Sequence, residues 1–267
     1  MPDALFELVT VPTGARSLRS REHGETFHPG IGPMEEARAL HVAQHRLAER
    51  MRPGAPFVIW DVGLGAGANA LAAIGALRHA PAPVHLLSFD QTLEPLRFAL
   101  AHAAELQYPL PFRAEIETLL ARGSVEMGSV AWSIVQGDFR ERVRDFSAPR
   151  AVLFDPYSPA ANPGMWTREV FQAIRERADA ECTLSSYSRS TVTRVNLLRA
   201  GWCVGRGSAT GEKTETSVAA TREALLREPL RREWLERVRR STAPGLRIGG
   251  DTPQAIAREL ESHPQMR

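Results

Sequence analysis

The chain carries a glycine-rich turn between residues 57 and 69 that strongly limits the folds open to it. An apolar run, Phe57–Trp60, ends in Asp61, and glycines then recur at alternate positions, Gly63, Gly65 and Gly67. Residues 68–74, which follow directly, have a helical composition. Because glycine adopts positive φ and leaves no Cβ in the way of a ligand, this pattern predicts a strand, a tight ligand-binding turn and a helix start.

The spacing of these glycines distinguishes two cofactor classes. Dinucleotide-binding turns carry G-x-G-x-x-G, whereas this chain has G-x-G-x-G with Asp61 two residues before the first glycine. That variant is typical of S-adenosyl-L-methionine (SAM) methyltransferases, in which the acid faces the methionine amino group. A nicotinamide- or flavin-binding oxidoreductase is the alternative from another class of enzyme.

Length and composition set the frame for this turn. The 267 residues are 43% hydrophobic and 24% charged, which is ordinary for one large α/β domain with appendages. The two cysteines lie in apolar contexts, which argues against a disulfide framework and a structural metal site, so no metal is expected. No run reaches about 18 apolar residues and the N-terminus lacks a basic-then-apolar signal pattern, so we expect a cytoplasmic protein without a membrane partner.

Alternating strand and helix patterns organise the rest of the chain. Strands are expected at 5–11, 57–61, 83–90, 131–136, 150–155 and 182–187, with a closing antiparallel pair at 201–204 and 216–220. Helices are expected at 33–51, 68–74, 92–106, 113–121, 167–180, 191–200, 222–241 and 252–262. We therefore divide the chain into an N-terminal extension (1–53), a core domain (54–221) and a C-terminal helical appendage (222–267).

Acids follow three of the expected strands. Asp90 lies 23 residues beyond Gly67, where an acid can accept hydrogen bonds from both ribose hydroxyls of an adenosyl ligand; a loop or capping acid is the competing interpretation. Asp138 either meets the adenine or caps the segment 139–146, and the pattern does not choose between the two. Asp155 opens a loop stiffened by three prolines, and its place beyond the carboxyl end of a strand makes it the best candidate for substrate contact.

Three sequence blocks together resemble one family. They are Asp61-x-Gly63-x-Gly65-x-Gly67-x-Asn69, the run from Phe154-Asp155-Pro156-Tyr157 to Trp166-Thr167, and Ser185-x-Tyr187-Ser188. From about residue 20 to residue 221 the chain is similar to the methyltransferase domain of the MnmC tRNA-modification proteins, in a free-standing form without their FAD-dependent oxidase domain. The resemblance implies a Rossmann-like class I SAM methyltransferase, an α/β fold with a seven-stranded, mostly parallel sheet and helices on both faces.

The resemblance also implies roles for individual residues. The cofactor set, which would bind SAM, comprises Glu36, Asp61, Gly63, Gly65, Gly67, Asn69, Asp90 and Asp138. Within it, Asp90 would hold the ribose, Asp138 the adenine, and Glu36 would lie near the methionine end of the donor. Asp155 would face the amine that is methylated, and the substrate set comprises Pro156, Tyr157, Trp166 and Tyr187. Tyr157 or Trp166 either stacks an exposed uracil or simply packs.

The implied reaction is methylation of the 5-aminomethyl group of wobble uridine-34, so the expected partner is the anticodon loop of a tRNA. An alkylammonium must lose a proton before its nitrogen can take a methyl group, and Asp155 could position it or accept that proton. Separate oxidase or GTPase-pathway enzymes would supply the modified tRNA. The alternatives are methylation of a small-molecule amine and a catalytically silent RNA-binding relative, and the sequence leaves the oligomeric state open.

Overall fold

The computed structural model describes residues 5–210, 214–247 and 250–267, and its centre is an open α/β sheet. Among these residues the sheet has eight strands in the order β5-β6-β4-β3-β7-β8-β10-β9. They are β3 (Phe57–Val62), β4 (Val84–Asp90), β5 (Ser124–Met127), β6 (Val130–Gln136), β7 (Ala151–Phe154), β8 (Thr183–Ser186), β9 (Cys203–Gly207) and β10 (Thr216–Ala220). The five central strands are parallel, whereas β5 and β10 run antiparallel to their neighbours.

The predicted Rossmann-like fold with its mostly parallel sheet is confirmed. The sheet has eight strands among the described residues, whereas seven were expected. The additional strand is β5, which pairs antiparallel with β6 at the sheet edge. Its four residues are half polar and offer no apolar run to detect. Gly128, at φ +64°, turns the chain back within two residues, so the pair is a hairpin that the sequence pattern presented as a loop.

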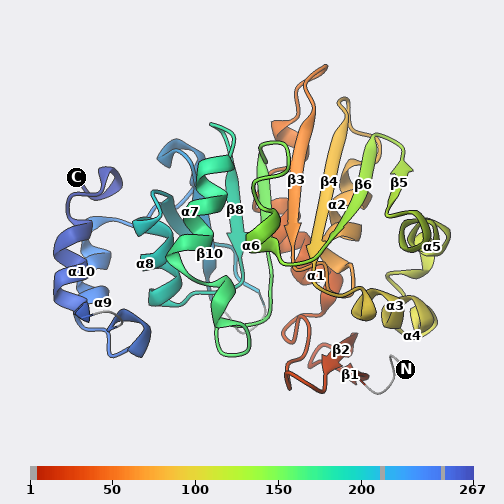
Figure 1. Ribbon diagram of the computed structural model, residues 1–267, viewed down its shortest axis with the longest axis horizontal. Helices are drawn as coiled ribbons and strands as arrows, with labels where there is room; N and C mark the ends of the chain where they lie inside the picture. Colours follow the sequence, from red (N-terminus) through yellow and green to blue (C-terminus); the bar gives the residue numbers. More distant parts are fainter. Residues whose placement is uncertain (1–4, 211–213, 248–249) are drawn as a thin grey trace.

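Helices cover both faces of the sheet (Figure 1). They are α2 (Ala68–Leu77), α3 (Glu94–Ala101), α4 (Ala103–Leu106), α5 (Arg113–Arg122), α6 (Phe139–Arg142), α7 (Arg168–Arg177) and α8 (Thr191–Arg199), with short 3₁₀ turns at η4 (Leu110–Phe112) and η5 (Pro163–Met165). Alternate strand residues face two apolar cores: Ile59 and Leu86 pack with Leu71 of α2, and Trp60 and Phe154 lie in the other core. The burial of both faces explains why the central strands read as continuous apolar runs.

The N-terminal region lies against the carboxyl ends of the central strands. Its hairpin of β1 (Phe6–Thr10) and β2 (Arg16–Ser20) is drawn beneath the ends of β3 and β4 in Figure 1. The helix expected over 33–51 is broken into α1 (Pro33–Ala37), the π-helical segment η2 (Arg38–Ala43) and the 3₁₀ turn η3 (Ala48–Arg50). Arg46, at φ +50°, cannot continue a right-handed helix, and this explains the break.

The prediction of a single helix over 222–241 was wrong. The segment forms η6 (Glu223–Leu225), η7 (Arg232–Trp234) and the five-residue helix α9 (Leu235–Arg239). Pro229 has no amide hydrogen and its segment bridges β9 at Gly205, so the backbone there is extended. The final helix is confirmed as α10 (Pro253–Leu260), flanked by 3₁₀ turns η8 (Pro244–Leu246) and η10 (Pro264–Met266).

Within the described ranges, no helix combines the length and the apolar character needed to cross a bilayer.

Candidate active site

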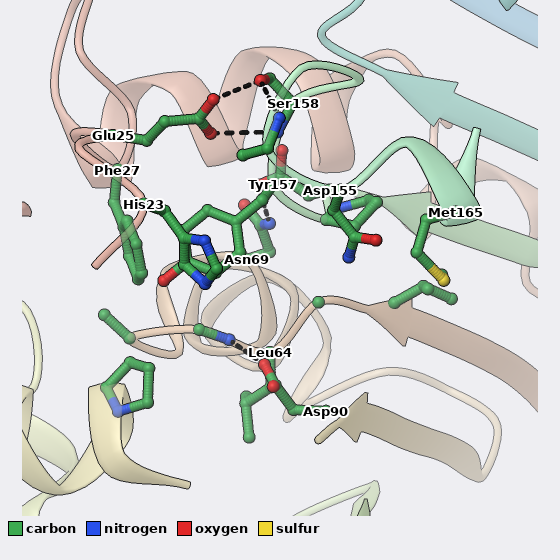
Figure 2. A pocket seen from close by; sticks show the side chains of 18 of the residues that line it. His23, Glu25, Phe27, Leu64, Asn69, Asp90, Asp155, Tyr157, Ser158 and Met165 are labelled. Carbon is green, nitrogen blue, oxygen red and sulfur yellow. Dashed lines mark hydrogen bonds between the residues drawn. The ribbon is translucent and has the colours of Figure 1, made fainter. Parts of the chain in front are cut away.

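A cavity of about 570 Å³ opens where the carboxyl ends of β3, β4 and β7 meet the N-terminal region, as Figure 2 shows. This volume is typical of small-molecule and cofactor sites. The structure brings nine of the residues expected in the site onto the cavity wall: Glu36, Gly63, Gly65, Asn69, Asp90, Asp155, Pro156, Tyr157 and Tyr187. The remaining expected residues, which lie behind this wall or beside it, are Asp61, Gly67, Asp138 and Trp166.

The glycine turn forms the floor of the cavity. Gly63, Gly65 and Gly67 all have positive φ, between +50° and +91°, so each depends on the absence of a side chain. A Cβ on Gly63 would lie 2.7 Å from the carbonyl oxygen of Asp155, and one on Gly65 would lie 3.2 Å from the Phe27 ring. The turn therefore holds the ends of β3 and β7 in direct backbone contact.

Asp90, the last residue of β4, fixes the turn from the other side. Its Oδ2 accepts a hydrogen bond from the Gly65 amide at 2.9 Å, and its Oδ1 accepts one from the Thr92 amide at 3.2 Å. Burial raises the pKa of this carboxyl, while the backbone amides pull it down. A carboxylate held in this way at the cavity wall is suited to accept hydrogen bonds from a ligand's hydroxyl groups.

Asp155 lies at the end of β7 with its side chain 13% exposed. Its Oδ2 accepts a hydrogen bond from Asn69 Nδ2 at 2.7 Å. Two imidazoles also face this oxygen: His28 Nε2 lies 3.8 Å away and His41 Nε2 lies 3.9 Å away. Nitrogen groups of Asn69, His28 and His41 therefore lie around the carboxylate, and Asn69 and His28 line the cavity together with it.

His28 is a site residue that sequence reasoning missed. Its ring lies between two acids, with Nδ1 at 3.7 Å from Glu36 Oε1 and Nε2 at 3.8 Å from Asp155 Oδ2. Burial lowers the pKa of His28, but the carboxylates of Glu36 and Asp155 beside its ring raise that pKa by more, so the net shift is upward. The residue sits at φ +48° in a loop without periodicity, so its only sequence signal is a histidine before Pro29.

The proline-rich loop is anchored by its aromatic residues. Trp166 is only 4% exposed, and its Nε1 donates a hydrogen bond to the Tyr157 carbonyl at 2.8 Å. Tyr187 donates from its hydroxyl to the Pro156 carbonyl at 3.1 Å. Tyr157 lines the cavity, and its ring lies 4.2 Å from that of His23 and 5.5 Å from that of Phe27. Trp166 thus shapes the loop from behind, whereas Tyr157 presents the aromatic surface.

A second contact between distant segments was also missed. Glu25 accepts hydrogen bonds from the amide of Ser158, at 3.0 Å, and from its hydroxyl (Figure 2). This pair ties the segment after β2 to the proline-rich loop, 133 residues further along the chain. Contacts over such separations leave no periodic pattern in the sequence.

Two of the expected cofactor residues have other contacts in the structure. Asp138 caps α6 by accepting from the Arg140 amide at 2.9 Å, and the same arginine's guanidinium pairs with the carboxylate and lowers its pKa. Asp61 is fully buried under the turn and accepts a hydrogen bond from Ser88 Oγ at 2.7 Å. Burial raises the pKa of Asp61 to about 8, so it is protonated at neutral pH in the structure described.

The cavity fits SAM on two grounds. Carboxylates suited to hydroxyl and ammonium groups line its wall. In addition, the buried Oδ1 of Asn69 has no hydrogen-bond partner among the described residues, so a polar group of a ligand could satisfy it.

Comparison with known proteins places this site in a family. Residues 102–222 match the model of an S-adenosyl-L-methionine-dependent methyltransferase family. The chain is 32% identical over 208 residues to the tRNA 5-methylaminomethyl-2-thiouridine biosynthesis bifunctional protein MnmC of Azoarcus sp. (strain BH72), covering 73% of this chain and 33% of that protein. Its counterpart in Aeromonas hydrophila is 29% identical over 262 residues, covering 89% and 38%. The chain thus spans about a third of the length of the curated relatives it matches.

A solved structure extends the likeness to the whole fold. The crystal structure of MNMC2 from Aquifex aeolicus superposes with a TM-score of 0.71 at 25% identity and covers 96% of this chain and 83% of that one. The glycine turn, the acids at the strand ends and these relatives agree on one conclusion. The chain is an MnmC-like, S-adenosyl-L-methionine-dependent methyltransferase domain.

Proposed function

We propose that this methyltransferase acts on an amine nitrogen, namely the 5-aminomethyl group of wobble uridine-34 in tRNA. The observation that supports this most is the direct contact between the two half-sites. Gly63 of the donor turn abuts the backbone of Asp155, so a carboxylate lies beside the place where the donor's reactive end would sit. A carboxylate there suits a cationic amine better than a neutral hydroxyl or carbon nucleophile.

SAM supplies an electrophilic methyl group when it is bound. We assign its binding to the turn glycines, to Asp90 for the ribose hydroxyls, and to Glu36 and Asn69 at the methionine end. Asp61, buried under the turn, would act on the methionine end through the turn itself, and Asp138 would approach the adenine only if it left Arg140. These assignments rest on the cavity wall and on the resemblance between the sequence blocks.

The chain's own residues prepare the nucleophile. Asp155 would accept a hydrogen bond from the substrate ammonium, orient its nitrogen toward the donor and take the proton. His28, with its raised pKa, lies 3.8 Å from the same carboxylate and offers a next position for that proton. Tyr157, backed by His23 and Phe27, offers the ring on which an unpaired uracil could stack.

The test is methyl transfer from labelled SAM to tRNA that carries 5-aminomethyluridine at position 34. We expect label in that nucleoside after digestion, and none in the matched tRNA whose position 34 is an unmodified uridine. Label that appears only in small amines would support the alternative substrate class, and a rate unaffected by salt would point the same way, since phosphate contacts make tRNA binding fall with salt.

A further inference from the structure

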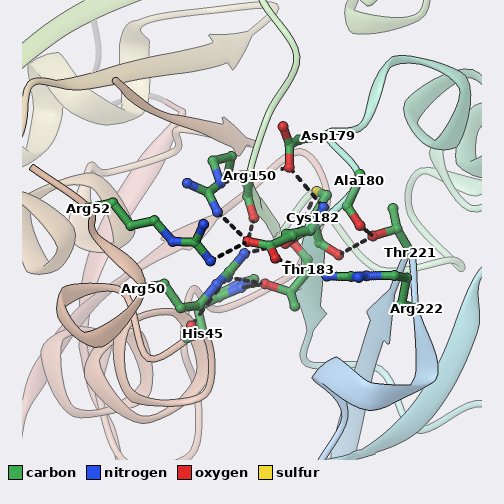
Figure 3. Close-up of polar contacts among 11 residues, drawn as sticks. His45, Arg50, Arg52, Arg150, Asp179, Ala180, Cys182, Thr183, Thr221 and Arg222 are labelled. Atoms are coloured by element: carbon green, nitrogen blue, oxygen red, sulfur yellow. Dashed lines mark hydrogen bonds and ion pairs between the residues drawn. The ribbon is translucent and has the colours of Figure 1, made fainter. Parts of the chain in front are cut away.

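A row of polar side chains is buried between the N-terminal region and β8. Thr183 and Ser185 are alternate residues of β8, so both face the same side of the sheet. Ser185 Oγ lies 2.7 Å from His41 Nδ1 and 2.7 Å from His45 Nε2. Thr183 Oγ1 lies 2.6 Å from His45 Nδ1 and accepts a hydrogen bond from Arg50 Nη1 at 2.7 Å. Figure 3 shows the end of this row, with Arg50, Thr183 and His45 side by side.

The identity of the groups gives the row a direction. Arginine can only donate, so the Thr183 hydroxyl accepts from Arg50 and keeps its own hydrogen for His45 Nδ1. His45 then carries its hydrogen on Nε2 and donates to Ser185, whose hydroxyl hydrogen in turn goes to His41 Nδ1. The opposite direction would leave the Thr183 hydrogen without an acceptor among the described residues, at a site only 5% exposed.

The row ends at the candidate catalytic acid. With Nδ1 accepting from Ser185, His41 carries its hydrogen on Nε2, and that atom lies 3.9 Å from Asp155 Oδ2. The same Nε2 is buried and has no hydrogen-bond partner among the described residues. A shift of about 1 Å would bring the two atoms to hydrogen-bond length.

Both imidazoles stay neutral, as this arrangement requires. Burial, together with the positive charge of Arg50, lowers the pKa of His45 to about 3, against a smaller opposing contribution from the backbone of Val152. Burial and the two neighbouring histidines, His45 and His28, lower the pKa of His41 well below its ordinary value.

We propose that His41 is a positioning residue: the hydrogen-bonded row from Arg50 through Thr183, His45 and Ser185 fixes its tautomer, so that its Nε2–H always points at Asp155. The fixed N–H stabilises the ionised form of Asp155 and holds the carboxylate in place. The importance of this for methyl transfer rests on the proposed function, in which Asp155 receives the substrate ammonium.

Other groups also lie near Asp155. Asp61 lies close to it but is protonated at neutral pH, and the Glu36 carboxyl lies behind His28. The Tyr187 ring is adjacent and uncharged. His28 and Asn69 favour the anion from the cavity side. His41 adds a donor from the protein side that a bound substrate would not displace.

The first experiment is nitrogen NMR on the protein labelled at its eight histidines, with the His41 and His45 signals assigned by their loss in His41→Gln and His45→Gln. We expect both rings to be neutral Nε2–H tautomers. A wild-type His41 that carries its hydrogen on Nδ1, or that is charged at neutral pH, would overturn the proposal. This measurement needs neither tRNA nor activity, so it stands apart from the test of the proposed function.

The second experiment removes the hydrogen bond between Thr183 and His45, which is separated from Asp155 by three further contacts of the row. Thr183→Val keeps the side-chain shape but cannot donate to His45, whereas Thr183→Ser keeps the hydroxyl. The matched control is Thr221→Val, which removes a hydroxyl that bonds to the carbonyls of Ala180 and Cys182 near the same end of β8. We expect Thr183→Val to mix the tautomers of His45 and His41 and to raise the pKa of Asp155 in carboxyl-carbon NMR.

Kinetics with the aminomethylated tRNA complete the test. For Thr183→Val we expect kcat near neutral pH to fall about tenfold, the acid limb of its pH profile to move to higher pH, and KM for SAM to stay unchanged. Thr183→Ser and Thr221→Val should keep the wild-type profile. An unchanged Asp155 pKa with unchanged tautomers in folded Thr183→Val would refute the proposal, as would an equal pH shift in Thr221→Val.

Discussion

The carboxyl ends and the amino ends of the parallel strands carry side chains of opposite charge, and these side chains have different kinds of partner. At the carboxyl ends, Asp90 and Asp155 face the cavity together with Glu36, and histidines and amides contact these acids. At the opposite end, arginines surround Glu181: Arg150 Nη2 lies 2.6 Å and Arg222 Nη2 lies 2.9 Å from its carboxylate.

This difference separates two uses of charge. Clustered buried acids raise each other's pKa and lower the free energy of unfolding. A ligand with cationic groups can offset this loss when it binds. Ion pairs near the surface, such as those of Glu181, hold segments of the chain together. Both partners belong to the protein, so no ligand is needed. We therefore expect substitutions at the carboxyl ends to change chemistry, and substitutions at the other end to change stability.

The largest expected effect is on the acidic end. Asp155→Asn keeps the shape of the side chain but removes the charge and the proton acceptor, so methyl transfer to aminomethylated tRNA should fall about 1,000-fold. SAM affinity by calorimetry should change less than about threefold, since the proposed function places Asp155 beside the amine rather than the donor. Activity within tenfold of the wild type would show that the chemistry lies elsewhere.

The next effect belongs to the basic end. Arg150→Met keeps part of the contact with the Phe57 ring but removes the ion pair with Glu181, so the free energy of unfolding should fall. The methyl-transfer rate of the folded protein should not change. Arg52→Gln is the exposed control and should lower the free energy of unfolding by less, as measured by urea unfolding of both variants. A tenfold loss of rate in Arg150→Met would remove the contrast between the two ends.

The last prediction concerns Asp61 and the pH dependence of stability. In the folded protein Asp61 keeps its proton to about pH 8, whereas in the unfolded chain it loses the proton near pH 4. Between these values the unfolded state binds fewer protons, so the free energy of unfolding falls as pH rises, by up to roughly 1.4 kcal/mol per pH unit from this group. Asp61→Asn should flatten that slope in urea unfolding, while the exposed Asp145→Asn should leave it intact. Equal slopes in both variants would mean that Asp61 is ionised in the fold.

The sequence predicted the elements that local patterns encode. The glycine turn, the apolar strands and the acids after them are local, and the structure has them where they were expected. His28 and His41 act through contacts with Asp155 more than 110 residues away, so no spacing rule could identify them. The segment 33–51 has the composition of a continuous helix. In the structure the helix is interrupted by the left-handed backbone of Arg46 and by packing on β8, which composition does not reveal.

The aromatic residues of the proline-rich loop show the same limit. Tyr157 and Trp166 were equal candidates for stacking, because sequence gives residue type without direction. In the structure Trp166 is buried against Phe154 and Tyr187, while Tyr157 faces the cavity. Trp166 follows the 3₁₀ turn η5, and its carbonyl accepts a hydrogen bond from Asn196 of α8, a contact between distant segments that no local pattern encodes.

The contact of Gly63 with the Asp155 carbonyl has a consequence for exchanging parts between relatives. Under the proposed function, this direct backbone contact between the turn and the loop helps to set the distance between the donor and the amine. A proline-rich loop transplanted from a relative to alter the acceptor would bring a differently seated carbonyl against the same turn. Such chimeras should be active only when the turn and the loop are transferred together from the same relative.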